Sequence, residues 1–317
     1  MELKLSPEVA RVGLRALRAV VLADGAYEDH ERRLMEAVAR ALGLDEDVHS
    51  LPPIAPAEAA AVLTDPVHRT RVVQAQLVTA LIDGAVTERE AMVIHGFARA
   101  LDVDEPRVRN LHHVLDGRLR WMQFDLMRRS PMVGDVARHA WDKAGLRGVW
   151  KQLAPFAPGR TLAQDEALAQ RYLALAALPE GTFGRVYFDH MRAQGFSFPG
   201  QPGGFPEGFM KHDLCHVLSG YGTDPTGECE VVAFIAGFMQ HDPFGYLFMI
   251  FLHCHLGIEV FQGDPTGRFA FDADRVVAAL RRGMAVNRDL YAVDFDWWPY
   301  FPRPLSEVRA ALGIAEA

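Results

Sequence analysis

An internal repeat in the N-terminal third constrains this chain more than any other feature. The segment Leu22–Glu46 (LADGAYEDHERRLMEAVARALGLDE) aligns without a gap with Leu81–Glu105 (LIDGAVTEREAMVIHGFARALDVDE), at a constant offset of 59 residues. Such self-similarity indicates two copies of one structural unit. Apolar residues recur in each copy with the spacing of a helix, so we expect the repeat to build a small helical bundle.

Each copy carries an Asp-Gly pair and then a glutamate, namely Asp24 with Glu31 and Asp83 with Glu90. Two interpretations are open for these acids. They could cap helices, as the Thr87-x-x-Glu90 spacing of a capping box indicates, or they could bind a metal ion. Two acids in each copy are too few for a closed calcium site, which favours capping.

These residues resemble the tellurite-resistance TerB family over roughly residues 10–115. The resemblance implies an acidic helical module with interaction or membrane-stress roles. We therefore expect a fold that is all-α. It would consist of a TerB-like duplicated domain over 1–115, a helical bridge and linker over 116–164, and a larger helical domain over 165–317.

Composition and charge exclude some function classes. The net charge of −8 and a pI near 5.9 argue against a nucleic-acid binder, which needs a basic surface. The apolar runs Val231–Met239 and Phe244–Leu252 are shorter than the roughly 18–20 residues of a membrane span. Three cysteines without a CxxC pair are typical of a reducing compartment, so we expect a cytoplasmic protein without a secretory signal.

The most chemically informative stretch is HDLCHVLSGYGTDPTGE, from His212 to Glu228. On one helix, His212 and His216 lie a turn apart on the same face, and Asp213 is close enough for all three side chains to reach one point. Glu228 would lie ~24 Å away if the helix were continuous. The intervening glycines and Asp224-Pro225 break the helix, however, so the chain can reverse.

We expect Thr226 to cap a second helix that returns Glu228 to the histidines. An ordinary polar helix end is the alternative, because a chance H-D-x-x-H is not rare in a chain with 13 histidines. The turn and the placed glutamate favour a metal site formed by His212, Asp213, His216 and Glu228. Neutral imidazoles and carboxylates suit zinc first, with iron(II) or manganese as alternatives.

Other histidines and cysteines near this motif are interpreted as structural. Cys215 is three residues after His212 and could approach the metal, but a small buried residue is the more ordinary role. His253 and His255 would face apart on a helix, and His241-Asp242-Pro243 is typical of a helix junction.

Three ordered segments resemble the coenzyme Q (ubiquinone) biosynthesis protein 4 family. They are the His212–Glu228 motif, LPEGTFGRVYFDHM (Leu178–Met191) and DWWPYFPRPLSEVRAALGI (Asp296–Ile314). The resemblance implies an all-helical fold, a divalent metal at the four residues named above, and oxidative decarboxylation of a prenylated ring precursor. The chain departs from the family at Val232 and Ile235, where a lysine and a second acid are usual, which leaves a different lipid substrate open.

The resemblance also implies partners. These are a prenylated lipid or quinone precursor, proteins of a biosynthetic complex, peripheral contact with the inner membrane, and a second copy in a homodimer. The apolar residues that could line a prenyl-chain groove are Phe244, Leu247, Phe248 and Phe251, although such a run is more often core.

Three alternatives to this enzyme remain open. The first is a non-catalytic, metal-stabilised protein that binds prenyl lipid or acts as a scaffold at the membrane surface. The second is an HD-type phosphohydrolase, which needs a further His and Asp that the sequence does not identify. The third is a zinc peptidase, which is disfavoured because no glutamate lies between the two histidines.

Overall fold

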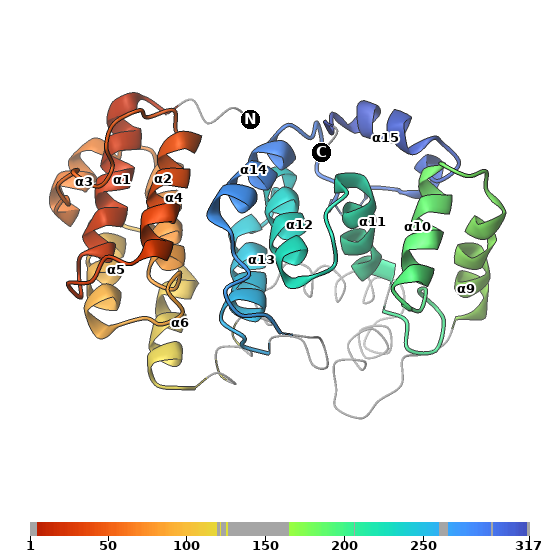
Figure 1. Ribbon diagram of the computed structural model, residues 1–317, viewed down its shortest axis with the longest axis horizontal. Helices are drawn as coiled ribbons and strands as arrows, with labels where there is room; N and C mark the ends of the chain where they lie inside the picture. Colours follow the sequence, from red (N-terminus) through yellow and green to blue (C-terminus); the bar gives the residue numbers. More distant parts are fainter. Residues whose placement is uncertain are drawn as a thin grey trace. The chain divides into compact units, whose positions relative to one another are not determined.

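The computed structural model describes residues 5–118, 121, 125, 165–205, 207–259, 266–292 and 294–315. Over these residues the regular elements are helices, and the β-type pairing is an isolated bridge between Thr182 and Pro304 (Figure 1). The prediction of an all-α fold is confirmed for this part of the chain. The predicted bridge over 116–164 lies almost entirely outside the described residues.

The chain divides into two compact units. The first contains Met1–Leu126 and Phe244–Ala278, and the second contains Met127–Pro243 and Ala279–Ala317. Residues 244–278 therefore pack with the N-terminal part of the chain, whereas the predicted domain over 165–317 includes them. The other boundaries of the domains over 1–115, 116–164 and 165–317 stay a prediction.

The two copies of the repeat form helices at matching positions in the first unit. Helices α1 (Pro7–Val21) and α4 (Pro66–Thr79) begin 59 residues apart, each with a proline. Helices α2 (Asp29–Ala41) and α5 (Glu88–Ala100) also begin 59 residues apart, each with an acidic residue, and have the same length. The core between α1 and α2 is formed by Leu14, Leu17 and Met35, which are at most 3% exposed. The helices of this unit are α1 Pro7–Val21, α2 Asp29–Ala41, α3 Pro56–Val62, α4 Pro66–Thr79, α5 Glu88–Ala100 and α6 Pro106–Leu115, with most of α13 Pro243–Ile250 and the π-helix η4 Phe251–His255.

The two glutamates of the repeat cap helices, as the sequence favoured, whereas Asp24 and Asp83 accept from the backbone N–H groups of Ala26 and Ala85 ahead of those helices. The backbone N–H of Thr87 donates to Glu90 Oε2 at 2.8 Å, and the N–H of Glu90 donates to Thr87 Oγ1 at 3.2 Å, which confirms the capping box. In the first copy the backbone N–H of Glu28 donates to Glu31 Oε2 at 2.7 Å. The TerB resemblance itself stays a prediction.

The second unit is built around an aromatic core. Tyr172, Tyr187, Phe198 and Phe301 are at most 1% exposed, and the rings of Tyr187 and Phe301 stack at 6.1 Å between centroids. The helices of this unit are α9 Glu166–Leu173, η2 Ala174–Ala177, α10 Phe183–Ala193, η3 Glu207–Phe209, α11 Met210–Ser219, α12 Pro225–Phe238, η5 Trp298–Tyr300 and α15 Leu305–Leu312, with the end of α14 Ala273–Met284.

Two of the segments noted in the sequence pack directly against each other in this unit. The backbone N–H groups of Phe183 and Gly184, at the start of α10, donate to the carbonyls of Arg303 and Phe301 at 2.8 and 2.9 Å. A side chain at Gly184 would place a Cβ 2.8 Å from that of Phe301, so the close approach requires glycine. The closing segment thereby fixes the start of α10, the helix that packs on α11.

In the described part of the chain, every helix is either too short or too polar to cross a membrane.

Candidate metal centre

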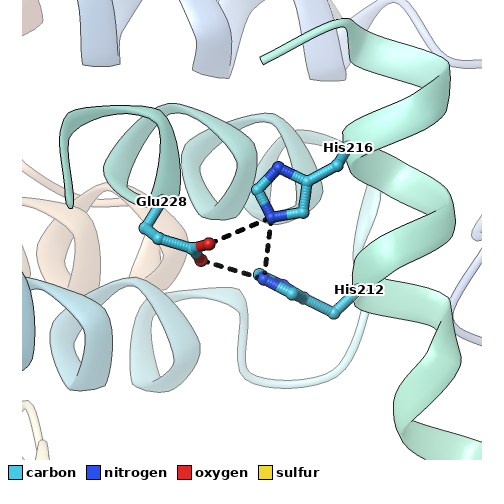
Figure 2. A group of neighbouring side chains, drawn as sticks. All are labelled: His212, His216 and Glu228. Atoms are coloured by element: carbon cyan, nitrogen blue, oxygen red, sulfur yellow. Dashed lines mark hydrogen bonds and ion pairs between the residues drawn. The ribbon is translucent and has the colours of Figure 1, made fainter. Parts of the chain in front are cut away.

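Helix α11 and helix α12 bring His212, His216 and Glu228 together (Figure 2). The Nε2 atoms of the two histidines are 3.0 Å apart. Glu228 Oε2 lies 2.9 Å from His212 Nε2, and Glu228 Oε1 lies 3.2 Å from His216 Nε2. Three of the four predicted ligands therefore present donor atoms within 4.8 Å of one another, which is the separation that ligands of one ion require.

The turn between the two helices has the tightness that the sequence indicated. Helix α11 ends at Ser219, and Gly220 follows in the left-handed conformation with φ of 80°. A Cβ at Gly227 would lie 2.1 Å from the carbonyl oxygen of Gly222, so this crossing of the chain is open only to glycine. The close crossing returns the first turn of α12 to the side of α11.

The predicted cap of α12 is wrong by two residues. Asp224, not Thr226, is the N-cap, and its Oδ1 accepts from the backbone N–H groups of Thr226 and Gly227 at 3.0 and 3.3 Å. The reason is Pro225, which occupies the first helical position and makes the residue before it the cap. Glu228 thus lies in the first turn of α12.

Two arginines hold the C-terminal end of α11. The Nε of Arg309 donates to the carbonyl of Leu218 at 2.9 Å, and the Nη1 of Arg282 donates to the carbonyl of Ser219 at 2.6 Å. The last carbonyls of a helix lack helical partners and carry partial negative charge. These contacts therefore fix α11 at the end nearest His216.

The orientation of His216 is set by a backbone contact. The ring is 2% exposed, and its Nδ1 lies 3.1 Å from the carbonyl oxygen of Tyr221. A carbonyl can only accept, so Nδ1 carries the proton that it donates. In the neutral imidazole, Nε2 then presents its lone pair to His212 and Glu228, as metal-binding histidines do.

The two Nε2 atoms and the Glu228 carboxylate share too few protons for every contact among them to be a hydrogen bond. A proton on His212 Nε2 can be donated either to Glu228 or to His216. In both cases the contact between Glu228 Oε1 and His216 Nε2 has no proton and brings two acceptors together. Burial raises the pKa of Glu228, but positive charge and hydrogen bonding from the imidazoles in their protonated form outweigh burial and hold that pKa well below its usual range. A divalent cation at the centre would satisfy all three atoms.

Asp213, the fourth predicted ligand, is not in this group. Burial raises the pKa of its carboxyl, and the nearby imidazoles of His212 and His216 oppose that rise. Asp213 therefore lies within electrostatic range of the centre, on a different side of α11 from the two histidines. Its role as a direct ligand stays a prediction.

Cys215 lies in the core and not at the centre. Its side chain is 0% exposed, and burial raises the pKa of the thiol well above its ordinary value. A metal ligand must be a thiolate, so the interpretation of Cys215 as a small buried residue is the better one.

The residues proposed for a prenyl-chain groove belong to the first unit. Phe244, Phe248 and Phe251 are 6%, 1% and 1% exposed, and Leu247 is half-buried. Their rings pack on one another and on neighbours of that unit, with 5.6 Å between the centroids of Phe244 and Phe248. They form core as they stand, and their contact with a lipid stays a prediction.

The second set of histidines has structural contacts. The Nε2 of His255 donates to the carbonyl of Ile82 at 2.8 Å, and its Nδ1 accepts from the N–H of Phe271 at 3.2 Å. Both ring nitrogens are therefore used by the backbone. His241 and Asp242 lie between α12 and α13, where Asp242 has φ of 48°, as expected for a helix junction.

Two polar residues of α10 were not singled out from the sequence. The hydroxyl of Tyr187 and the Nε2 of His190 are buried and have no hydrogen-bond partner among the described residues. Their presence among apolar residues of the segment Phe183–Ala193 was the available signal. The spacing of a motif on α11 gives no information on which side chains a neighbouring helix contributes.

Comparison with known proteins assigns no family and no function to this chain. The chain matches no model of a protein family, and no curated protein matches it. Its structure is similar to the crystal structure of a "Putative ubiquinone biosynthesis protein" from Nostoc punctiforme, with a TM-score of 0.33 and 19% identity over 77% of this chain and 96% of that one. At these values the similarity carries no argument about this chain.

Proposed function

We propose that this chain binds one divalent metal ion through His212, His216 and Glu228 and acts in ubiquinone or prenyl-quinone biosynthesis. The observation that carries the metal assignment is the convergence of two imidazole nitrogens and a carboxylate oxygen from two helices. The quinone assignment is supported by the three ordered segments that resemble the coenzyme Q biosynthesis protein 4 family.

The donor set fits a metal of intermediate hardness. Two nitrogens and one or two carboxylate oxygens suit zinc, iron(II) or manganese, and the absence of a thiolate at the centre disfavours a closed structural zinc site. Three protein ligands also leave a position for an outside ligand, as in catalytic sites.

The reaction that we propose is oxidative decarboxylation of a prenylated aromatic ring. The ring carboxyl leaves as CO2, a hydroxyl from water takes its place, and O2 accepts the two electrons and is released as H2O2. A bound divalent ion supplies Lewis acidity, which polarises the ring carboxylate or a neighbouring hydroxyl. His216 holds its ligand geometry through Tyr221, and the ionised Glu228 supplies the negative charge that retains the cation.

The test uses a prenylated hydroxybenzoate labelled at its carboxyl carbon, offered in detergent micelles to the full chain with metal and O2. We expect labelled CO2 and a ring hydroxyl from the wild type, and neither product from His216→Ala. The matched control is His241→Gln, which alters an exposed histidine of the same unit and should keep the activity.

Bound metal and bound lipid without any CO2 would contradict the enzymatic proposal. That result would favour the non-catalytic lipid-binding or scaffold protein. Turnover in His216→Ala equal to that of the wild type would contradict the role of the metal centre.

A further inference from the structure

Helix α10 leaves two buried polar atoms unsatisfied next to α11. They are the hydroxyl oxygen of Tyr187 and the Nε2 of His190, neither of which has a hydrogen-bond partner among the described residues. Burying a polar group without a hydrogen-bond partner is unfavourable. Such a group is explained when a ligand that binds to the protein supplies the missing partner.

His190 lies beside the candidate metal centre. Its ring stacks on that of His216, with 5.9 Å between centroids and 20° between planes. Burial lowers the pKa of His190, and the residues whose charges also act on that pKa are His216, Glu228 and His212, the three residues of the centre. Tyr187 differs, because its charged neighbours are Asp213 and Glu207.

His190 is a neighbour of the centre and not one of its ligands. The three donor atoms that lie within 4.8 Å of one another do not include a nitrogen of His190. A ring next to the ligands but outside the group is suitably placed to contact a molecule that occupies the remaining position of the metal. Because a divalent ion takes about four to six ligands, at least one such position exists beside three protein donors.

The chemistry of that outside ligand follows from the hydrogen-bond donor that His190 can offer it. A neutral imidazole with its proton on Nε2 donates one hydrogen bond, and a carboxylate oxygen is the acceptor that strengthens such a bond most. A carboxylate can also bind the metal through its second oxygen. One small carboxylate could therefore satisfy both the cation and the buried Nε2.

We propose that His190 is the substrate-binding residue of this centre and that its Nε2–H donates to a carboxylate oxygen of the ligand held at the metal. The inference rests on the proposed function, since it assumes a metal at His212, His216 and Glu228. It extends that function by assigning to α10 the recognition of an aromatic carboxylate.

The experiment uses the full chain loaded with Co²⁺, whose visible absorption reports the ligands of the metal, and benzoate as the probe. We expect benzoate to change the spectrum of the wild type. His190→Phe should bind Co²⁺ with the same stoichiometry and show the same spectrum without benzoate. Its Kd for benzoate should rise by about tenfold or more, the value of one hydrogen bond to a charged group.

Two further variants separate recognition from folding. His190→Gln keeps an N–H donor of similar reach and should restore part of the benzoate affinity. His241→Gln changes an exposed histidine of the same unit and should bind benzoate as the wild type does. Thermal unfolding of each variant shows whether the fold is retained.

The outcomes distinguish this inference from the proposed function. A wild type that binds no Co²⁺ refutes the metal centre itself. A wild type that binds Co²⁺ but does not respond to benzoate, or a His190→Phe variant that binds benzoate normally, refutes the role of His190 alone. Loss of Co²⁺ from His190→Phe would make His190 a ligand or a structural residue and would also overturn the inference.

Discussion

The Nδ1 of His216 donates to the carbonyl oxygen of Tyr221 across 3.1 Å, and this contact decides which nitrogen of the ring faces Glu228. Tyr221 lies in the turn between α11 and α12, so the turn that returns Glu228 also fixes the tautomer of His216. The position of Glu228 and the direction of the His216 lone pair thus have one structural origin.

Removing the charge of Glu228 should weaken metal binding. In Glu228→Gln the amide keeps the shape of the side chain but loses the negative charge that the two imidazoles stabilise. Removing a residue that only hydrogen-bonds to a metal ligand already lowers metal affinity about 10- to 100-fold. Removing the charge of Glu228 itself should therefore lower metal affinity at least about 100-fold. Competition with a chromophoric chelator measures the affinity. Glu180→Gln, an exposed change in the same unit, is the control and should match the wild type.

Removing the metal should lower the thermal stability of the chain. A metal that binds only the folded state stabilises it by about 2.7 kcal/mol when its free concentration is 100 times Kd. The melting temperature of the wild type should therefore fall after treatment with a chelator and recover when zinc is returned. His216→Ala should melt at the same temperature with and without zinc, and a zinc-dependent rise in that variant would count against the site.

The turn should fail when Gly227 gains a side chain. In Gly227→Ala the new Cβ would lie 2.1 Å from the backbone carbonyl oxygen of Gly222, which cannot move away as a flexible side chain could. We expect a loss of more than about 2 kcal/mol in the free energy of unfolding and a fall in bound metal. Gly96→Ala is the control, because its Cβ would meet only Pro56 at 3.7 Å. Equal effects in the two variants would contradict the importance of the turn.

The repeat should make the stability of the chain depend on pH. Burial, reinforced by nearby carboxylates such as that of Asp83, raises the pKa of Glu31 and of Glu90 to about 7. The folded state therefore binds more protons than the unfolded state between about pH 4.5 and pH 7. The stability from these groups is present below the unfolded pKa and is lost as the pH rises through the folded value.

Substitution of both glutamates tests this pH dependence. The double variant Glu31→Gln, Glu90→Gln should flatten the fall in melting temperature between pH 5 and pH 8, a range across which each carboxyl contributes on the order of 1 kcal/mol. Glu58→Gln, an exposed change in the same unit, should leave that fall unchanged. A double variant with the pH profile of the wild type would refute the assignment.

The sequence predicted the parts of the site that depend on local structure. The spacing of His212 and His216 on a helix, and the glycines and proline of the turn, were enough to predict the return of Glu228. The prediction of Thr226 as the cap is wrong because Pro225 takes the first helical position and makes Asp224 the cap.

The remaining features depend on contacts between distant segments. The position of His190 beside His216 is set by the packing of α10 on α11, which the sequence spacing of either helix does not determine. The inclusion of residues 244–278 in the first unit likewise depends on long-range contacts, such as the hydrogen bond between His255 and Ile82.

The central claim is that His212, His216 and Glu228 hold one divalent ion, and the most direct measurement is the metal content of the purified chain by mass spectrometry. After dialysis against a weak chelator, the wild type should retain one zinc, iron or manganese ion per chain. Variants His212→Ala, His216→Ala and Glu228→Gln should retain almost none, and His241→Gln should match the wild type. A wild type without metal, or full occupancy in His216→Ala, would contradict the account.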